Sequence, residues 1–160
     1  MLKLPYGISD FEQVRSEGYI YIDRTHFIPI VEETGKQLLF LRPRRFGKSL
    51  WLSMLANYYD VARADRFEQL FGTLTIGKNP TALHNRYLIM RWDFSGIQIS
   101  GSAAEFRTVL YNHINRAIED CVTRYQHLIN YPVQVDHNDA LSSFQSLLTG
   151  VQTTPYKLYL

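Results

Sequence analysis

The sequence has little of what marks disulfide-bonded, metal-binding or membrane proteins. It contains one cysteine, Cys121, so neither an internal disulfide nor a cluster of thiolate ligands can form. Its five histidines show no ligand-like pairing with Cys121. No apolar run approaches the roughly 18 residues of a membrane span, and the N-terminus lacks the apolar core of a secretory signal. We therefore expect a cytoplasmic protein without a membrane partner.

What the chain does contain is ordinary for a folded domain, except for one local excess of charge. It has 160 residues, 46% hydrophobic and 14% aromatic, which predicts one packed domain rather than disorder. The net charge of +2 by itself implies no partner. From Lys36 to Lys48, however, there are five basic residues and no acid. Such a cluster attracts a polyanion, which leaves nucleotide, nucleic acid and acidic protein as candidates.

Hydrophobic periodicity predicts strands that alternate with helices. Apolar runs predict strands over 37–42, 87–93 and 156–160. The first of these is nearly continuous, as in a strand buried on both faces of a parallel sheet. Helical spacing predicts helices over 49–59 and 103–125, the second beginning at a capping box of Ser102 and Glu105. This alternation predicts an α/β fold with a parallel sheet.

Two further helices are predicted from their end signals. Ser9 and Glu12 fit a capping box at the start of a short helix, which Gly18 can end. A helix over 139–148 is predicted to end at Gly150. Its expected inward residues are Leu141, Phe144, Leu147 and Leu148.

Residues 42–49, Arg-Pro-Arg-Arg-Phe-Gly-Lys-Ser, have the order of a phosphate-binding P-loop: strand 37–42, turn 43–48, and a helix from about 48. Gly47 lets the backbone close around a phosphate. Lys48 would place its ammonium on the β- and γ-phosphates, and Ser49 would offer its hydroxyl to Mg²⁺. The usual pattern, G-x-x-x-x-G-K-[ST], has glycine where this chain has Arg42. A chance Gly-Lys-Ser at a helix start is the alternative interpretation.

The same segment, with Leu41 before it and Leu50 after it, resembles the nucleotide loop of the AAA-ATPase-like family of bacterial proteins. Residues 7–12, Gly-Ile-Ser-Asp-Phe-Glu, and 18–27, Gly-Tyr-Ile-Tyr-Ile-Asp-Arg-Thr-His-Phe, are also similar to that family. In the family, Arg-Pro-Arg-Arg-Phe replaces the first glycine, so Arg42 fits. Asp93-Phe-Ser after a strand fits as well.

The resemblance implies a P-loop NTPase-type parallel sheet with flanking helices. Residues 1–35 would be a lead-in and 36–160 part of a nucleotide-binding core. ATP and Mg²⁺ would be the cofactors, with Lys48 catalytic and Ser49 on the metal. The nucleotide-binding residues carried over are Pro43, Arg44, Arg45, Phe46, Gly47, Lys48, Ser49 and Leu50.

The resemblance also implies an acidic Walker B segment after the strand 156–160, and in many members a nuclease-like C-terminal domain. We therefore expect a fold that is incomplete at its C-terminus, with weak stability, and ATP hydrolysis only in a longer chain. Asp93, at the end of a predicted strand, is the internal rival for the missing acid, against an ordinary turn-forming role. Asp23 would cap a helix, with a place near the nucleotide as the alternative. Cys121 is expected in the core.

Four functions remain open from the sequence. They are an ATPase in its complete form, a regulatory nucleotide-binding module without turnover, a nucleic-acid-binding protein that uses the basic cluster of 36–48, and a truncated chain with no function of its own. A steep salt dependence of binding would favour nucleic acid.

Overall fold

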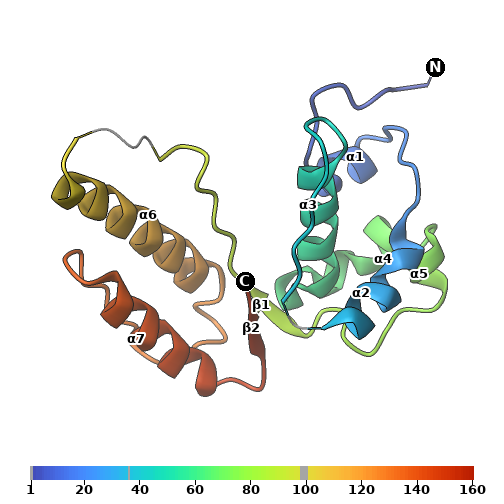
Figure 1. The fold of residues 1–160 in the computed structure, drawn as a ribbon. Coiled ribbons are helices and arrows are strands. Elements are labelled where there is room, and N and C mark those ends of the chain that lie inside the picture. Colours follow the sequence, from blue (N-terminus) through green and yellow to red (C-terminus); the bar gives the residue numbers. More distant parts are fainter. Residues whose placement is uncertain (1, 36, 98–100) are drawn as a thin grey trace. The chain divides into compact units, whose positions relative to one another are not determined.

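The computed structural model describes residues 2–35, 37–97 and 101–160, and it divides into two compact units, Met1–Asn85 and Arg86–Leu160 (Figure 1). The first unit is helical and carries the 42–49 segment. The second unit combines two long helices with a small sheet. Each unit is described separately below.

Short helices surround one longer helix, α3, in the first unit. Its elements are α1 (Phe11–Ser16), η1 (Thr25–Phe27), α2 (Ile28–Thr34), α3 (Lys48–Tyr59), η2 (Val61–Arg66), α4 (Phe67–Phe71) and α5 (Thr75–Lys78). Helix α1 packs against α3 and α4. The core is strongly aromatic, because the Phe71 ring lies 5.0 Å from Phe11 and 5.4 Å from Tyr58, centroid to centroid. Burial of these rings, all at or near 0% exposure, anchors α1, α3 and α4 to one another.

The end signals of the first unit are partly as predicted. Gly18 has a left-handed φ of 72°, as expected of a glycine that ends a helix, and α2 ends at Thr34 with Gly35 as its C-cap. The predicted cap at Ser9 is wrong. Asp10 is the N-cap instead, with an extended backbone and a carboxylate that accepts a hydrogen bond from the Gln13 N–H. Asp and Ser cap equally well, so composition alone could not fix the first residue of the helix.

The predicted buried strand over 37–42 is also wrong. In the described part of the chain, residues 37–43 form no strand, and Leu39 and Leu41 are 83% and 78% exposed. A strand requires a neighbour that pairs with its backbone, and the sheet among the described residues consists of β1 and β2 alone. The apolar run predicted a strand that does not form, because the pairing and burial of a strand depend on partner strands that the run itself does not supply.

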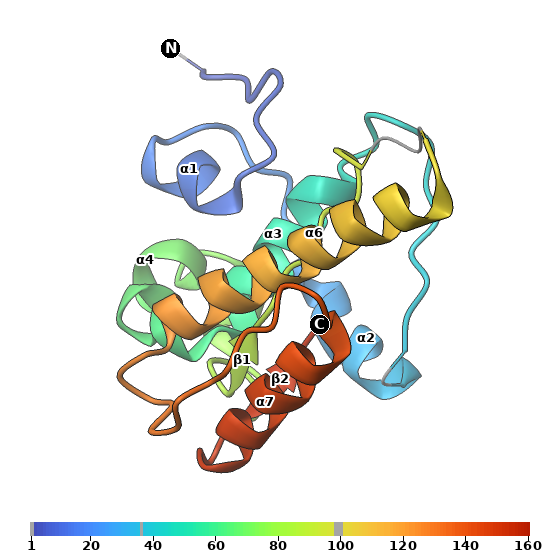
Figure 2. The same cartoon turned by 90° about the vertical axis from the view of Figure 1, so that its left-hand side faces the viewer.

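The second unit contains β1 (Tyr87–Ile89), α6 (Ala103–Arg124), α7 (Ala140–Gln152) and β2 (Lys157–Tyr159). The two strands are parallel, with Leu88 opposite Leu158, and the Met90 N–H extends the ladder by donating to the Tyr159 carbonyl at 2.9 Å. Helices α6 and α7 lie side by side in both views (Figures 1 and 2). The α/β class and the parallel pairing are thus confirmed, on a sheet smaller than predicted.

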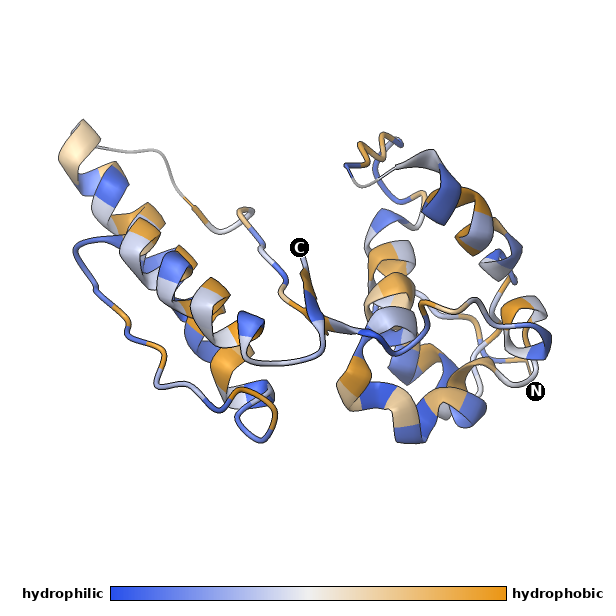
Figure 3. Ribbon diagram, turned by 90° about the horizontal axis from the view of Figure 1, so that it is seen from below, coloured by the Kyte–Doolittle hydropathy of each residue, from blue (hydrophilic) through white to orange (hydrophobic). Residues whose placement is uncertain are grey.

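Helix α6 begins as the sequence predicts. Ser102 and Glu105 form both bonds of the capping box. In Figure 3, bands of hydrophobic and hydrophilic residues alternate along this helix, which follows the grey segment 98–100. Its inward face carries Ile118 and Cys121, which are 0% and 3% exposed, so the prediction of a core cysteine is confirmed.

Helix α7 corrects two predictions. Gly150 does not end the helix, which continues to Gln152. A Cβ at Gly150 would lie 3.0 Å from Ile129 Cγ2 and 3.1 Å from Val133 Cγ2, so the glycine serves close packing rather than termination. The inward stripe is Ala140, Ser143, Leu147 and Val151, whereas Leu141 is 70% and Leu148 37% exposed. Among the described helices, none combines the length and apolar character that crossing a membrane requires.

Candidate functional site

The candidate site is the turn at residues 44–47, which leads directly into α3. Two residues here have left-handed backbone conformations, Arg45 with φ 66° and Gly47 with φ 75°. The second is favourable for glycine, whereas a left-handed arginine costs about 1–2 kcal/mol. Non-glycine residues held in this region cluster at functional sites. These two reversals curl the chain so that it enters α3 at Lys48.

Lys48 folds back over the turn that precedes it. Its Nζ donates to the Arg42 carbonyl at 2.5 Å and to the Pro43 carbonyl at 3.0 Å. An ammonium has three donors, so these two bonds leave one donor for another acceptor. Lys48 therefore joins the first residue of α3 to the two residues at the start of the turn, and it keeps a positive charge beside them.

The N-terminus of α3 has the properties of an anion site. Gly47 is the N-cap and supplies no side-chain cap, so the first-turn amides of this 12-residue helix lack that acceptor. Within the first turn, Ser49 is exposed and Leu50 is half-buried. A phosphate fits this donor set, and the Ser49 hydroxyl suits Mg²⁺, which takes few protein ligands and completes its shell from phosphates and water.

Aromatic contacts hold the preceding arm, residues 37–43, along α3. The Phe40 and Trp51 rings stack with centroids 6.3 Å apart and planes at 27°. On Phe40 lies the Arg42 guanidinium, with its Cζ 5.5 Å from the ring centroid. Lys48 and Trp51 are three residues apart in a helix, so both lie on the side of α3 that the arm follows.

The remaining loop side chains project into solvent. Arg44 and Arg45 are exposed, and the Phe46 side chain is 59% exposed. The structure thus separates the arginines by role, since Arg42 lies against an aromatic ring while Arg44 and Arg45 surround the turn with unburied positive charge. Charge of one sign around a backbone nest favours a polyanionic ligand.

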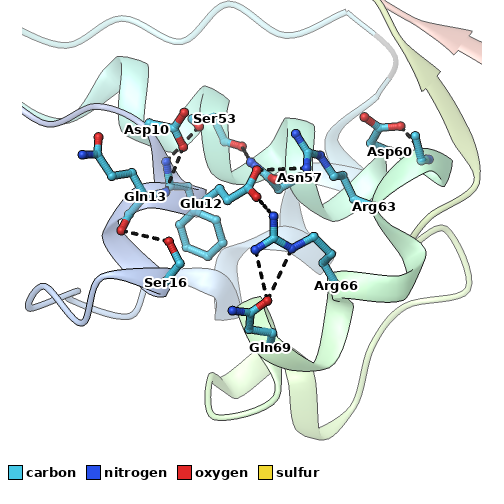
Figure 4. A network of polar contacts seen from close by, with 12 residues as sticks. Asp10, Glu12, Gln13, Ser16, Ser53, Asn57, Asp60, Arg63, Arg66 and Gln69 are labelled. Carbon is cyan, nitrogen blue, oxygen red and sulfur yellow. Dashed lines mark hydrogen bonds and ion pairs between the residues drawn. The ribbon is translucent and has the colours of Figure 1, made fainter. Parts of the chain in front are cut away.

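Helix α3 is itself fixed by the lead-in helix α1. The Phe11 N–H, buried at the start of α1, donates to Ser53 Oγ at 2.9 Å. Next to it, Glu12 forms ion pairs with Arg63, at 3.0 Å, and with Arg66 (Figure 4). Arg66 also donates to Gln69, which extends the network onto α4. The family-like residues 7–12 therefore support the helix that begins at the loop.

Asp23 has a structural position. One carboxylate oxygen accepts hydrogen bonds from the Thr25 N–H and hydroxyl, at 2.8 and 2.6 Å. The other accepts from the Thr75 N–H and hydroxyl, at 2.8 and 2.7 Å. Desolvation tends to raise the pKa of Asp23, but these hydrogen bonds outweigh it and lower the pKa to about 2. The predicted cap at Asp23 is wrong, because Arg24 is the N-cap of η1 and has no side-chain cap bond. Asp23 instead joins Thr25 of η1 to Thr75 of α5 through these hydrogen bonds.

Asp93 makes a turn-forming contact. The carboxylate is exposed and accepts a hydrogen bond from the Ser95 N–H at 2.9 Å, and hydrogen bonding with Ser95 lowers the pKa of Asp93. No group of three or more metal-ligating side chains occurs among the residues described. The turn-forming role weighed for Asp93 therefore has direct support.

The arm contacts were missed by sequence reasoning. Phe40 was assigned to a buried strand, and Trp51 fell within the helix predicted over 49–59, so neither was connected with the loop. The available signal was the three-residue spacing of Lys48 and Trp51, which places both on one side of the helix. Spacing within one element does not reveal which other segment lies against it.

Comparison with known proteins gives a family-level match. The family described as "Predicted AAA-ATPase" matches residues 5–158. A curated relative, the "Uncharacterized protein in vnfD 5'region" of Azotobacter chroococcum mcd 1, is 45% identical over 58 residues. These residues are 36% of this chain and span 11% of that relative's length. No solved structure matches the chain.

Proposed function

This chain belongs to the AAA-ATPase-like family, and from that premise we propose that it binds Mg-ATP through residues 42–49. The observation that carries the proposal is the geometry at the start of α3. An uncapped helix N-terminus, the left-handed Gly47 and the Lys48 ammonium all converge on one short turn. Few ligands other than a phosphate chain use all three.

Each loop residue has a distinct part in the proposal. The amides of the turn and of the first turn of α3 would hold the phosphate oxygens, with Lys48 as a point charge on the β- and γ-phosphates. Pro43 fixes the backbone direction before the turn. Arg44, Arg45 and Phe46 belong to the turn itself, and Leu50 follows half-buried in the first turn of α3. Ser49 would hold Mg²⁺, which neutralises charge on the phosphates when it is bound.

We propose hydrolysis only for a chain that also carries the acidic Walker B segment implied by the family resemblance. Water attack on the terminal phosphate needs a carboxylate that orients the water. The Asp93 carboxylate already accepts a hydrogen bond from the Ser95 N–H, so Asp93 is a poor candidate for the carboxylate that orients the water.

Titration calorimetry with Mg-ATP tests the proposal on the wild type and on Lys48→Ala. Loss of a charge-assisted contact to phosphate is expected to weaken binding at least about tenfold, which corresponds to about 1.4 kcal/mol. Lys78→Ala, which removes an exposed lysine of α5, is the matched control and should bind normally. Circular dichroism checks that helix content is unchanged. Equal affinity of the wild type and Lys48→Ala would refute the proposal.

Nucleic acid is the second candidate ligand, favoured by the exposure of Arg44, Arg45 and Phe46. Basic side chains with an exposed aromatic ring suit a single strand, since bases stack on the ring. Binding of a fluorescent oligonucleotide at several salt concentrations tests this candidate. A steep loss of affinity with salt, together with no competition by Mg-ATP, would assign the basic cluster to nucleic acid instead.

A further inference from the structure

The contacts around Lys48 form a closed chain that begins and ends on α3. Trp51 stacks on Phe40. The Phe40 ring lies under the Arg42 guanidinium. The Arg42 carbonyl then accepts a hydrogen bond from Lys48 Nζ, three residues before Trp51 on the same helix. Because each contact joins the next, the chain links Lys48 Nζ to Phe40 and Trp51, two side chains outside residues 42–49.

We propose that Phe40, Trp51 and the Arg42 guanidinium are positioning residues for Lys48. They fix residues 40–42 along α3, so that the Arg42 and Pro43 carbonyls hold Nζ at the mouth of the turn. We call the three stacked groups the arm stack and the two carbonyl bonds the lysine clasp. The inference rests on the proposed function for its effect on nucleotide, but the clasp can be tested without any nucleotide.

The exposure of the arm makes this positioning necessary. Residues 37–43 form no strand in the described structure, so no sheet holds their backbone. Leu39 and Leu41 face solvent at 83% and 78%, whereas Leu38 and Phe40 are 45% and 44% exposed. One side of the arm is thus more covered than the other, and it is the Phe40 ring that contacts α3, through Trp51. Without these contacts, the entropy of a free arm would disperse the two carbonyls that Lys48 uses.

The physical size of the effect is modest and measurable. Loss of a stacked aromatic pair and an exposed cation–π contact together should change the equilibrium between the held and the free arm about tenfold. If the arm stack organises the turn before ligand arrives, its loss should appear as weaker phosphate binding, because the turn must then be ordered at the moment of binding.

The first experiment measures the lysine clasp directly. An ammonium that donates to two carbonyls must leave this arrangement and lose a proton to solvent before the neutral amine can attack acetic anhydride, which releases acetate. Limited acetylation with acetic anhydride, read by mass spectrometry, should therefore label Lys48 severalfold faster in Phe40→Leu than in the wild type. The exposed Lys78 and Lys157 provide internal references. Leu39→Ala, a change on the other side of the same arm, should leave the rate of Lys48 labelling unchanged. Phe40→Tyr keeps the aromatic ring, so it should label Lys48 at the wild-type rate.

The second experiment measures binding of Mg-ATP and of inorganic tripolyphosphate by calorimetry. Phe40→Leu and Trp51→Leu should each lower the affinity for both ligands about tenfold. Loss of ATP affinity alone would mean that the arm stack contacts the base, which overturns a role through Lys48. In a double-mutant cycle, Phe40→Leu should add little to Lys48→Ala, because both changes remove the same interaction. Additive effects would also overturn the inference.

The outcomes separate the two proposals. If the wild type binds no triphosphate but Phe40→Leu accelerates Lys48 labelling, the proposed function fails and the positioning role stands. If the wild type binds ATP and Phe40→Leu changes neither labelling nor affinity, the positioning role fails and the proposed function stands. If Leu39→Ala and Phe40→Leu change the rate of Lys48 labelling equally, the general apolar character of the arm, not the ring stack, positions Lys48. That result would refute the inference.

Discussion

Replacing Asp23 by asparagine tests how the lead-in segment is held to α5. The carboxylate accepts four hydrogen bonds, two at each oxygen, from Thr25 and Thr75. Asparagine keeps the shape but has one acceptor oxygen and one amide nitrogen. In either orientation its NH₂ group meets the N–H of one threonine, donor against donor. The threonine hydroxyl at that oxygen can turn and accept from the NH₂ group, so one of the four bonds is lost outright and one backbone donor is left without its acceptor.

The expected cost follows from the lowered pKa of Asp23. A shift from the ordinary value of 3.8 to about 2 corresponds to at most about 2.4 kcal/mol at neutral pH. Asp23 is partly exposed, so solvent screening reduces this figure, and about 1–2 kcal/mol is a realistic expectation.

The sign of the pH dependence is fixed by the direction of the shift. Because the pKa of the folded state lies below that of the unfolded state, the stabilisation is fully present above about pH 4 and is lost as the pH falls toward about 2. About half of the contribution should be gone at pH 3. The difference in free energy of unfolding between the wild type and Asp23→Asn should shrink in parallel.

Urea unfolding at pH 7, 5, 4 and 3, followed by circular dichroism, measures this difference. Asp10→Asn is the matched control, because Asp10 caps α1 through one hydrogen bond and asparagine caps equally well. That variant should stay within about 0.5 kcal/mol of the wild type at neutral pH. A destabilisation by Asp23→Asn that is constant from pH 7 to pH 3 would refute the reasoning, since it would show that the charge of Asp23 is not involved.

Two further substitutions probe the backbone of the loop and the core of the second unit. Gly47→Ala should destabilise by about 1–2 kcal/mol and weaken Mg-ATP binding, because φ is 75° and no atom would lie within 4 Å of the new Cβ, so the cost is backbone strain alone. Gly96→Ala, also in open space, should be near neutral, and a similar effect of both in thermal melts would contradict this account. Tyr125→Phe should destabilise by about 1–3 kcal/mol, because the buried Ile89 N–H loses its bond to the Tyr125 hydroxyl at 2.7 Å. A urea midpoint equal to that of the wild type would show that this N–H finds another acceptor.

Helices were predictable where their signals lay within a single segment. The capping box of Ser102 and Glu105 and the apolar spacing that follows it located α6, and both bonds of the box are present. Helix α7 was predicted as well, but its end was misplaced. A glycine can end a helix or can allow close packing inside one, and the sequence does not show which. At Gly150 the absence of a Cβ allows Ile129 and Val133 to approach, and this reason depends on residues far away in the sequence.

The arm illustrates the other limit of sequence reasoning. Residues 38–41 are uniformly apolar, and such runs predict burial on both faces of a sheet. Burial, however, depends on the neighbours, and the described structure holds this arm to α3 through the Phe40–Trp51 ring stack and the Lys48 bonds to the Arg42 and Pro43 carbonyls. The position of the loop was predictable from Gly47, Lys48 and Ser49, whereas the carbonyl partners of Lys48 were not, because backbone acceptors carry no signature in the sequence.

The geometry gives a physical account of arginine at residue 42, where the usual pattern has glycine. What the turn uses at this residue is its carbonyl, which accepts the Lys48 bond at 2.5 Å. The side chain lies on Phe40, and the left-handed conformations occur at Arg45 and Gly47 instead. A side chain at residue 42 is therefore compatible with the turn and adds a contact that glycine cannot make. It follows that Arg42→Gly, although closer to the usual pattern, should loosen the arm and speed the acetylation of Lys48. Unchanged labelling in that variant would mean that Phe40 and Trp51 hold the arm without the guanidinium.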